Sequence, residues 1–142
     1  MVGDDSKLPF WFDDGLPTSG ASENELALLE SMIGERLPPA LRDLLAVRNG
    51  GVSNFAAFVV GETRVPLPAL FSVMEISASV ANSESFGTPD GVVAFGGDGD
   101  DWVGLDYRQG RVPEVVYQEH DDAPLEVVAS SVDELLAGLV EE

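Results

Sequence analysis

The chain of 142 residues contains no cysteine, a single histidine and only seven basic residues. Without cysteine there are no disulfides, thiolate metal sites or cysteine nucleophiles. One histidine also excludes any metal site that needs two or three imidazoles. Long apolar runs are missing as well, because stretches such as residues 55–60 are far shorter than the ~20 residues that span a bilayer. The acidic start, MVGDDSKLPF, lacks the basic and then apolar pattern of a signal peptide, so we expect a soluble, cytoplasmic protein.

The shortage of bases leaves a large excess of negative charge. The 26 acidic residues give a net charge of −19, and most of it lies in the second half of the chain. Residues 1–71 hold 10 acids and 5 bases (net −5), whereas residues 72–142 hold 16 acids and 2 bases (net −14). Such a field repels nucleic acid and anionic membranes and attracts basic proteins. Solubility alone is the plainer explanation, but if the charge has a target, we expect a protein and neither nucleic acid nor a membrane.

The length and a hydrophobic share of 44% fit a single compact domain over residues 1–142. Prolines and glycines interrupt any regular period in residues 1–21. This irregular, acidic segment contains three consecutive aromatic residues, Phe10, Trp11 and Phe12. A loose tail would leave these rings in water, so we expect the segment to dock on the domain. The sequence predicts no particular oligomeric state.

Two helices are predicted after this segment. Ser22 and Glu25 have the spacing of a capping box, which places the first helix over 23–33 with a stop at Gly34. The second helix begins at Pro38 and Pro39, because a residue in the first turn needs no amide hydrogen. The stripe of the second helix continues through Leu41, Leu44, Leu45 and Arg48. Its expected stop is Asn49, Gly50 and Gly51.

The middle of the chain changes to the two-residue period of β-strands. Residues 55–60 and 63–66 flank Gly61 and Glu62, which predicts a hairpin. Residues 70–80 are expected to form a strand that turns into a helix. Further strands are predicted over 92–95, 102–107, 114–119 and 125–129. In the second of these, alternation places Trp102, Gly104 and Asp106 on one face and Val103, Leu105 and Tyr107 on the other.

A second capping box, Ser131 with Glu134, opens a closing helix whose apolar residues extend to Leu139. The order of elements predicts an α+β fold with two N-terminal helices at its start. A central, mostly antiparallel sheet of about five or six strands follows, and a C-terminal helix packs on that sheet.

The segment FGGDGDDWVGLDY, residues 95–107, concentrates aspartates and glycines. A calcium loop of the EF-hand type starting at Asp98 fails, since its fifth position is Trp102. A phosphate loop fails too, because its third glycine and Gly-Lys-Ser/Thr are missing and the carboxylates would repel phosphate. A looser Ca²⁺ or Mg²⁺ site built from Asp98, Asp100 and Asp101 remains open, as does a catalytic carboxylate pair. We favour a glycine-rich turn between two strands with a charged, solvated tip.

No other group of residues completes an enzyme site. His120 stands beside Asp121 and Asp122, but the chain has no Gly-x-Ser-x-Gly elbow, so a surface histidine is the favoured interpretation. Trp102 and Tyr107 would need basic surroundings to serve as an RNA-stacking platform. We therefore interpret them as core or interface aromatics and predict a protein without catalytic residues, metal or cofactor.

The order of motifs resembles the SUKH superfamily, which includes bacterial immunity proteins and fungal cell-wall-synthesis regulators. The resemblance covers about residues 10–140 and rests on the first helix with Glu30 and Gly34, on Leu37-Pro38, and on the Asn-Gly-Gly stop. It continues through FWFDD, VVAFGGDGDDWVGLDY, VPEVVYQEHDD and VVASSVDELLAGL. Leu41 and Val132 stand where many members have an aromatic residue, which concerns packing detail rather than the fold.

The resemblance implies a binding protein that neutralises a toxin domain, often a nuclease, by covering it. The alternative is an intracellular regulatory adaptor that binds a cellular protein. Because nuclease clefts are basic, we expect an acidic face to bind such a partner, with aromatic anchors beside it. The candidate partner-binding residues are Asp98, Asp100, Asp101, Trp102, Tyr117, Glu119, Asp121 and Asp122.

Overall fold

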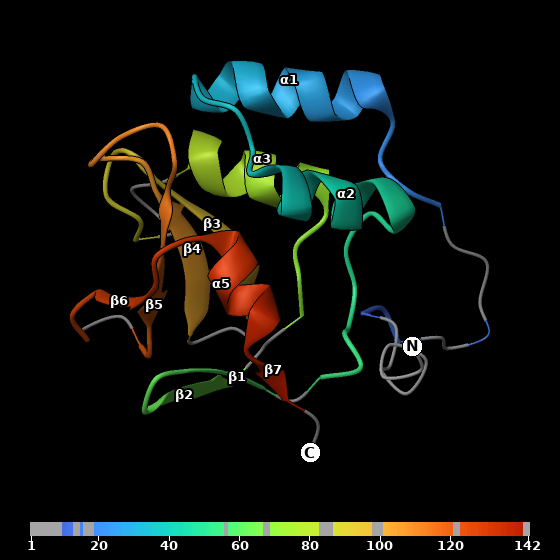
Figure 1. Ribbon diagram of the computed structural model, residues 1–142. Helices are drawn as coiled ribbons and strands as arrows, with labels where there is room; N and C mark the ends of the chain where they lie inside the picture. The colour runs from blue at the N-terminus through green and yellow to red at the C-terminus, as the bar shows by residue number, and fades with distance from the viewer. Residues whose placement is uncertain are drawn as a thin grey trace.

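The computed structural model describes residues 10–12, 15, 19–55, 57–66, 69–82, 87–97, 101–120 and 123–140. The helices are α1 Glu23–Ile33, α2 Pro39–Val47, α3 Val73–Ala81 and α5 Val132–Ala137. The strands are β1 Ala57–Val60, β2 Thr63–Pro66, β3 Val92–Gly97, β4 Trp102–Asp106, β5 Glu114–Gln118, β6 Glu126–Ala129 and β7 Leu139–Val140. Figure 1 shows α1, α3 and α2 gathered at one end and the strands below and beside them. The predicted α+β class is confirmed.

The strands form two antiparallel sheets, of order β2-β1-β7 and β3-β4-β5-β6, where the sequence predicted one central sheet. The β1–β2 hairpin stays apart from the larger sheet, and the end of the closing helix adds a third strand to it. That helix stops at Gly138, and Leu139, predicted to be helical, instead pairs with Phe58 of β1. A β-carbon at Gly138 would lie 2.1 Å from the carbonyl oxygen of Val59, so only glycine allows this close approach.

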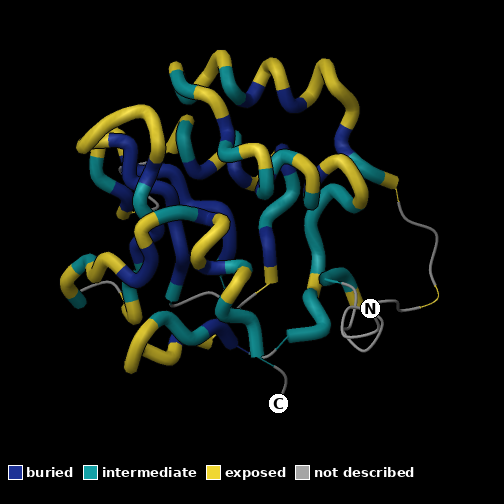
Figure 2. Tube along the Cα trace, viewed as in Figure 1, coloured by how far each residue is buried: buried dark blue, intermediate teal, exposed yellow. Residues whose placement is uncertain are grey.

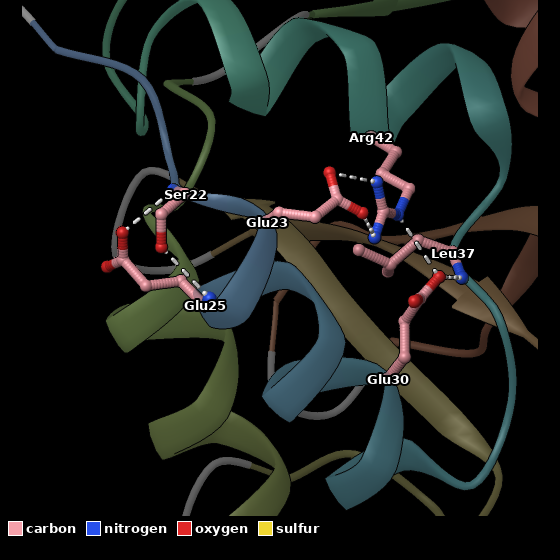
Figure 3. Close-up of polar contacts among 6 residues, drawn as sticks. All are labelled: Ser22, Glu23, Glu25, Glu30, Leu37 and Arg42. Carbon is pink, nitrogen blue, oxygen red and sulfur yellow. Dashed lines mark hydrogen bonds and ion pairs between the residues drawn. The ribbon is translucent and has the colours of Figure 1, made fainter.

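Helix α1 has the predicted bounds and the predicted capping box. Ser22 Oγ accepts the amide hydrogen of Glu25 at 3.1 Å, and a Glu25 carboxylate oxygen accepts the amide hydrogen of Ser22 at 2.9 Å (Figure 3). Gly34 ends the helix in the left-handed region with φ of 81°. Leu26 and Leu29 are buried on its inner face.

The stop of α2 differs from the prediction. Arg48 was expected to continue the helix, but it has extended dihedral angles, and the last helical residue is Val47. Asn49 is not left-handed: its side-chain oxygen accepts the amide hydrogen of Val73, the first residue of α3, at 2.8 Å. Gly50 does have positive φ, and a β-carbon there would lie 2.6 Å from the backbone nitrogen of Ser72. The triplet therefore brings the end of α2 against the start of α3.

Residues 70–80 form the expected short extended piece followed by a helix. Leu70 makes isolated antiparallel bridges to both Gly51 and Gly96, which ties the N-terminal half to the larger sheet. Helix α3 then begins with a complete capping box of Ser72 and Glu75, which the sequence analysis did not identify.

The main core lies between the helices and one face of the four-stranded sheet. Val103, Leu105 and Tyr107 of the β4 segment belong to this core. A smaller apolar cluster occupies the other face and includes Trp102 and Val116. The predicted alternation is therefore confirmed, and Figure 2 shows the buried strands in dark blue.

The aromatic residues before α1 contact the body of the protein. Trp11 bridges to Ser53, and its indole nitrogen donates to the carbonyl of Leu44 at 3.0 Å. The ring of Phe10 meets that of Trp11 edge-on at 5.0 Å, which adds an aromatic contact to the strand-like pairing. Within the described part of the chain, no helix is long and apolar enough to cross a bilayer.

Candidate protein-binding surface

The β3–β4 and β5–β6 connections leave the larger sheet at the same end. In the antiparallel ladder Trp102, the first residue of β4, pairs with Gln118, the last residue of β5. Asp101, just before β4, and Glu119, just after β5, therefore each lie one residue beyond this pair. Tyr117 pairs in turn with Glu126 of β6. The ladder therefore brings carboxylates from three strand ends to one end of the sheet.

Tyr117 is the centre of this group. Its hydroxyl donates to Asp101 Oδ2 at 2.8 Å. Burial, the hydrogen bond to Asp101, and the negative charges of Asp101, Glu119 and Glu126 together raise the pKa of Tyr117 well above its ordinary value. The three carboxylates are thus close enough to act on the same phenol, and we call Asp101, Tyr117, Glu119 and Glu126 the acidic end.

The second oxygen of Asp101 finds no donor among the residues that the structure describes. Asp101 Oδ1 is buried and accepts no hydrogen bond from any of them. A buried acceptor left unpaired lowers stability by roughly 1–3 kcal/mol, and in native proteins such an atom is commonly satisfied by ordered water or an ion. The charge that the acidic end presents to a partner therefore comes from its exposed carboxylates, Glu119 and Glu126.

Trp102 supports this end of the sheet from the opposite face. It is only 4% exposed, and its indole nitrogen donates to Gln118 Oε1 at 2.8 Å. The same Gln118 donates to the carbonyl oxygen of Ala123 at 3.0 Å, which holds the start of the β5–β6 connection. In this conformation the indole of Trp102 is packed inside the protein, so its contribution to the surface is to position the two connections.

The remaining candidates divide into two groups. Glu119 is exposed at the acidic end. Asp98, Asp100, Asp121 and Asp122 lie outside the described residues. Glu126 was missed by sequence reasoning because its place beside Tyr117 depends on the β5–β6 register, which local patterns do not fix.

A family comparison adds to this geometry. The model of the SMI1 / KNR4 family (SUKH-1) matches residues 20–138. The chain belongs to this family. The match confirms the SUKH resemblance and runs from just before the capping box of α1 to the glycine that ends α5. No curated protein matches the chain.

The charge of this SUKH-1 domain is distributed unevenly along the larger sheet. The two bases of the second half of the chain, Arg108 and Arg111, both lie between β4 and β5, at the end opposite Asp101. Arg108 forms an ion pair there with Asp106, with Nε–Oδ1 and Nη2–Oδ2 distances of 2.9 Å. The guanidinium also lowers the pKa of Asp106. No described arginine or lysine from this half of the domain therefore offsets the acidic end.

The acidic end consists of three carboxylates and one phenol. Across the described ranges, no group of three histidine or acidic side chains is arranged to hold a metal ion. What the SUKH-1 domain does present is hydrogen-bond acceptors and negative charge on a braced sheet end. That combination suits a donor-rich, positively charged partner.

Proposed function

We propose that this SUKH-1 protein is an immunity protein, which binds a cognate bacterial toxin domain through the acidic end and thereby neutralises it. The observation that carries the proposal is the convergence of Asp101, Glu119 and Glu126 around Tyr117. Membership in the SMI1 / KNR4 family supports it, since the SUKH resemblance implies protein binding and no catalysis. Under this proposal the protein acts in the cytoplasm.

The toxin that suits this surface best is a nuclease. A nuclease binds a polyanion, so its cleft is lined with basic side chains. A negatively charged protein is steered into such a cleft and then excludes the substrate by occupying it. Arginine or lysine of the toxin would pair with the exposed carboxylates of Glu119 and Glu126. Blocking is then both electrostatic and steric.

Association kinetics with the toxin domain encoded by the neighbouring gene test the proposal. The variant Glu119→Gln/Glu126→Gln removes two exposed charges from the acidic end. We expect its association rate at low salt to fall about three- to tenfold, and to lose most of the ionic-strength dependence seen with the wild-type protein. Asp43→Asn/Asp133→Asn removes the same charge from exposed positions on α2 and α5 and is the matched control.

Three outcomes are decisive. Inhibition of the toxin in a one-to-one complex, with the acidic-end variant more affected than its control, supports the proposal. An association rate that does not change with salt, or equal effects of the two variants, rejects the acidic end as the docking surface. Absence of binding to the neighbouring toxin rejects the immunity role and favours the regulatory adaptor.

A further inference from the structure

A pocket of about 260 Å³ opens at the end of the larger sheet opposite the acidic end. It lies where the C-terminal ends of α1 and α3 meet the start of β3 and the residue after β4 (Figure 1). Its lining includes Ile33, Val80, Val93 and Tyr107, together with Glu35 and Asp90. Cofactors and drug-sized ligands occupy roughly 300–1,000 Å³, so this pocket is sized for a single side chain or a comparably small group.

The lining combines apolar side chains with polar surface and two carboxylates. Tyr107 is 8% exposed, and its hydroxyl is already satisfied by donating to the carbonyl oxygen of Arg36 at 2.8 Å. Glu35 is half-buried and Asp90 is exposed, and neither forms an ion pair with a residue that the structure describes. Two carboxylates, unpaired among the residues that the structure describes, thus stand beside a cavity of mixed polarity.

Two carboxylates act electrostatically on Tyr107 in the wall of the pocket. Burial is the main reason that the pKa of Tyr107 is raised, and the charges of Glu35 and Glu30 raise it further. Two nearby bases are already paired: Arg108, whose side chain lies against Gly91, pairs with Asp106 at 2.9 Å, and Arg42 pairs with Glu23 at 2.7 Å. Arg36 is exposed and follows Glu35 directly, so it partly offsets the two rim charges.

We propose that this pocket receives one arginine side chain of a protein partner. Arginine carries a long apolar stem that packs along hydrophobic walls while its charged head stays near polar groups. Its planar guanidinium is weakly hydrated and matches carboxylates better than an ammonium does, which favours arginine over lysine. Arginine is also among the residues that most often anchor protein interfaces. Glu35 and Asp90 are the carboxylates that would hold the guanidinium.

The pocket is separate from the acidic end. Asp101 and Tyr107 flank opposite ends of β4, and six residue steps of extended strand span about 20 Å. The inference therefore does not depend on a toxin partner, and either proposal can fail alone. A partner that used both sites would contact the two ends of one sheet.

A blocked amino acid tests the pocket directly. We expect acetyl-arginine amide, titrated into ¹⁵N-labelled protein, to shift the backbone amide signals of Gly91, Val93 and Tyr107 in a saturable way. Acetyl-citrulline amide has nearly the same shape without the charge and should give little response. Acetyl-lysine amide should bind more weakly than the arginine probe.

Variants then assign the binding to the rim carboxylates. Glu35→Gln/Asp90→Asn should weaken the arginine probe about fivefold, because it removes both charges while keeping the shape of the pocket. Asp43→Asn/Asp133→Asn should leave the affinity nearly unchanged, and equal thermal unfolding of the two variants shows that both are folded. Equal responses to the arginine and citrulline probes, shifts elsewhere only, or undiminished binding by Glu35→Gln/Asp90→Asn would overturn the proposal, and equal binding of the lysine probe would overturn the preference for arginine.

Discussion

Tyr117 and Asp101, 16 residues apart in the chain, are joined by a 2.8 Å hydrogen bond between the phenol and the carboxylate. On the other face of the sheet, Trp102 and Gln118 make a second bond of 2.8 Å between the same two strands. The ends of β4 and β5 are thus braced on both faces. A binding surface held in this way loses little conformational entropy when a partner docks.

The raised pKa values of the two tyrosines predict that the protein loses stability in alkali. Burial is the main cause of the raised pKa of both Tyr107 and Tyr117 in the folded protein. A phenol with a higher pKa in the folded state than in the unfolded state contributes to the free energy of unfolding. The contribution is fully present below the unfolded pKa of about 10 and is lost as the pH rises above that value. Urea denaturation from neutral to alkaline pH should show an unfolding free energy that falls from about pH 10 upward.

Phenylalanine variants separate the contributions of the two phenols. Tyr117→Phe should lower the free energy of unfolding near neutral pH by about 1–2 kcal/mol, since Asp101 loses its donor. The same variant should show a shallower alkaline decline, because one titrating group is gone. Tyr107→Phe, which loses only the bond to the carbonyl of Arg36, serves as the comparison. An unchanged alkaline decline in both variants would assign it to other groups.

Glu30 is predicted to stabilise the α1–α2 connection far more than Glu23 does. Glu30 Oε2 accepts the amide hydrogen of Leu37 at 2.8 Å and lies 3.5 Å from Arg42 Nε (Figure 3). The Glu30 side chain is 18% exposed, whereas that of Glu23 is 80% exposed although its contact with Arg42 is shorter. Removing a partly buried acceptor leaves the Leu37 donor unpaired, so Glu30→Ala should lower the free energy of unfolding by about 2 kcal/mol.

Glu23→Ala is the matched control, because it removes a carboxylate that also contacts Arg42. Solvent screens this exposed pair, so only a small change is expected. Chemical denaturation of both variants and of Glu30→Gln, which keeps an acceptor oxygen, decides the point. Equal losses for Glu23→Ala and Glu30→Ala would contradict the role given to the amide of Leu37.

The position of the Trp102 indole is predicted to require glycine at position 104. A β-carbon at Gly104 would lie 2.7 Å from Trp102 Cζ3 and 3.0 Å from the carbonyl oxygen of Val93. Gly104→Ala should therefore lower the free energy of unfolding by about 1–3 kcal/mol and change the fluorescence of Trp102. In the Trp102→Leu background the same change should be less destabilising, since the ring contact is removed first. Additive effects in the double variant would show that the ring is not the obstacle.

Local sequence signals were sufficient for much of the fold. Ser22 with Glu25, and Gly34, fixed the two ends of α1. Strict alternation assigned the two faces of β4 correctly. These features depend on hydrogen bonds and side-chain directions within a few residues, so a single segment already contains the information. For the same reason, the family resemblance could be recognised from the order of motifs.

The tertiary structure decided the rest. Asn49, expected to end α2, accepts a hydrogen bond from α3, and Leu139, expected to be helical, became part of a second sheet beside Phe58. The acidic end likewise depends on strand register, which places Glu126 next to Tyr117. Register and close backbone approach are set by packing between segments far apart in the chain, and a one-residue shift would turn each strand's side chains to the other face. The sequence by itself therefore determined the elements, the α+β class and the excess of acid, whereas only long-range packing decided which carboxylates meet.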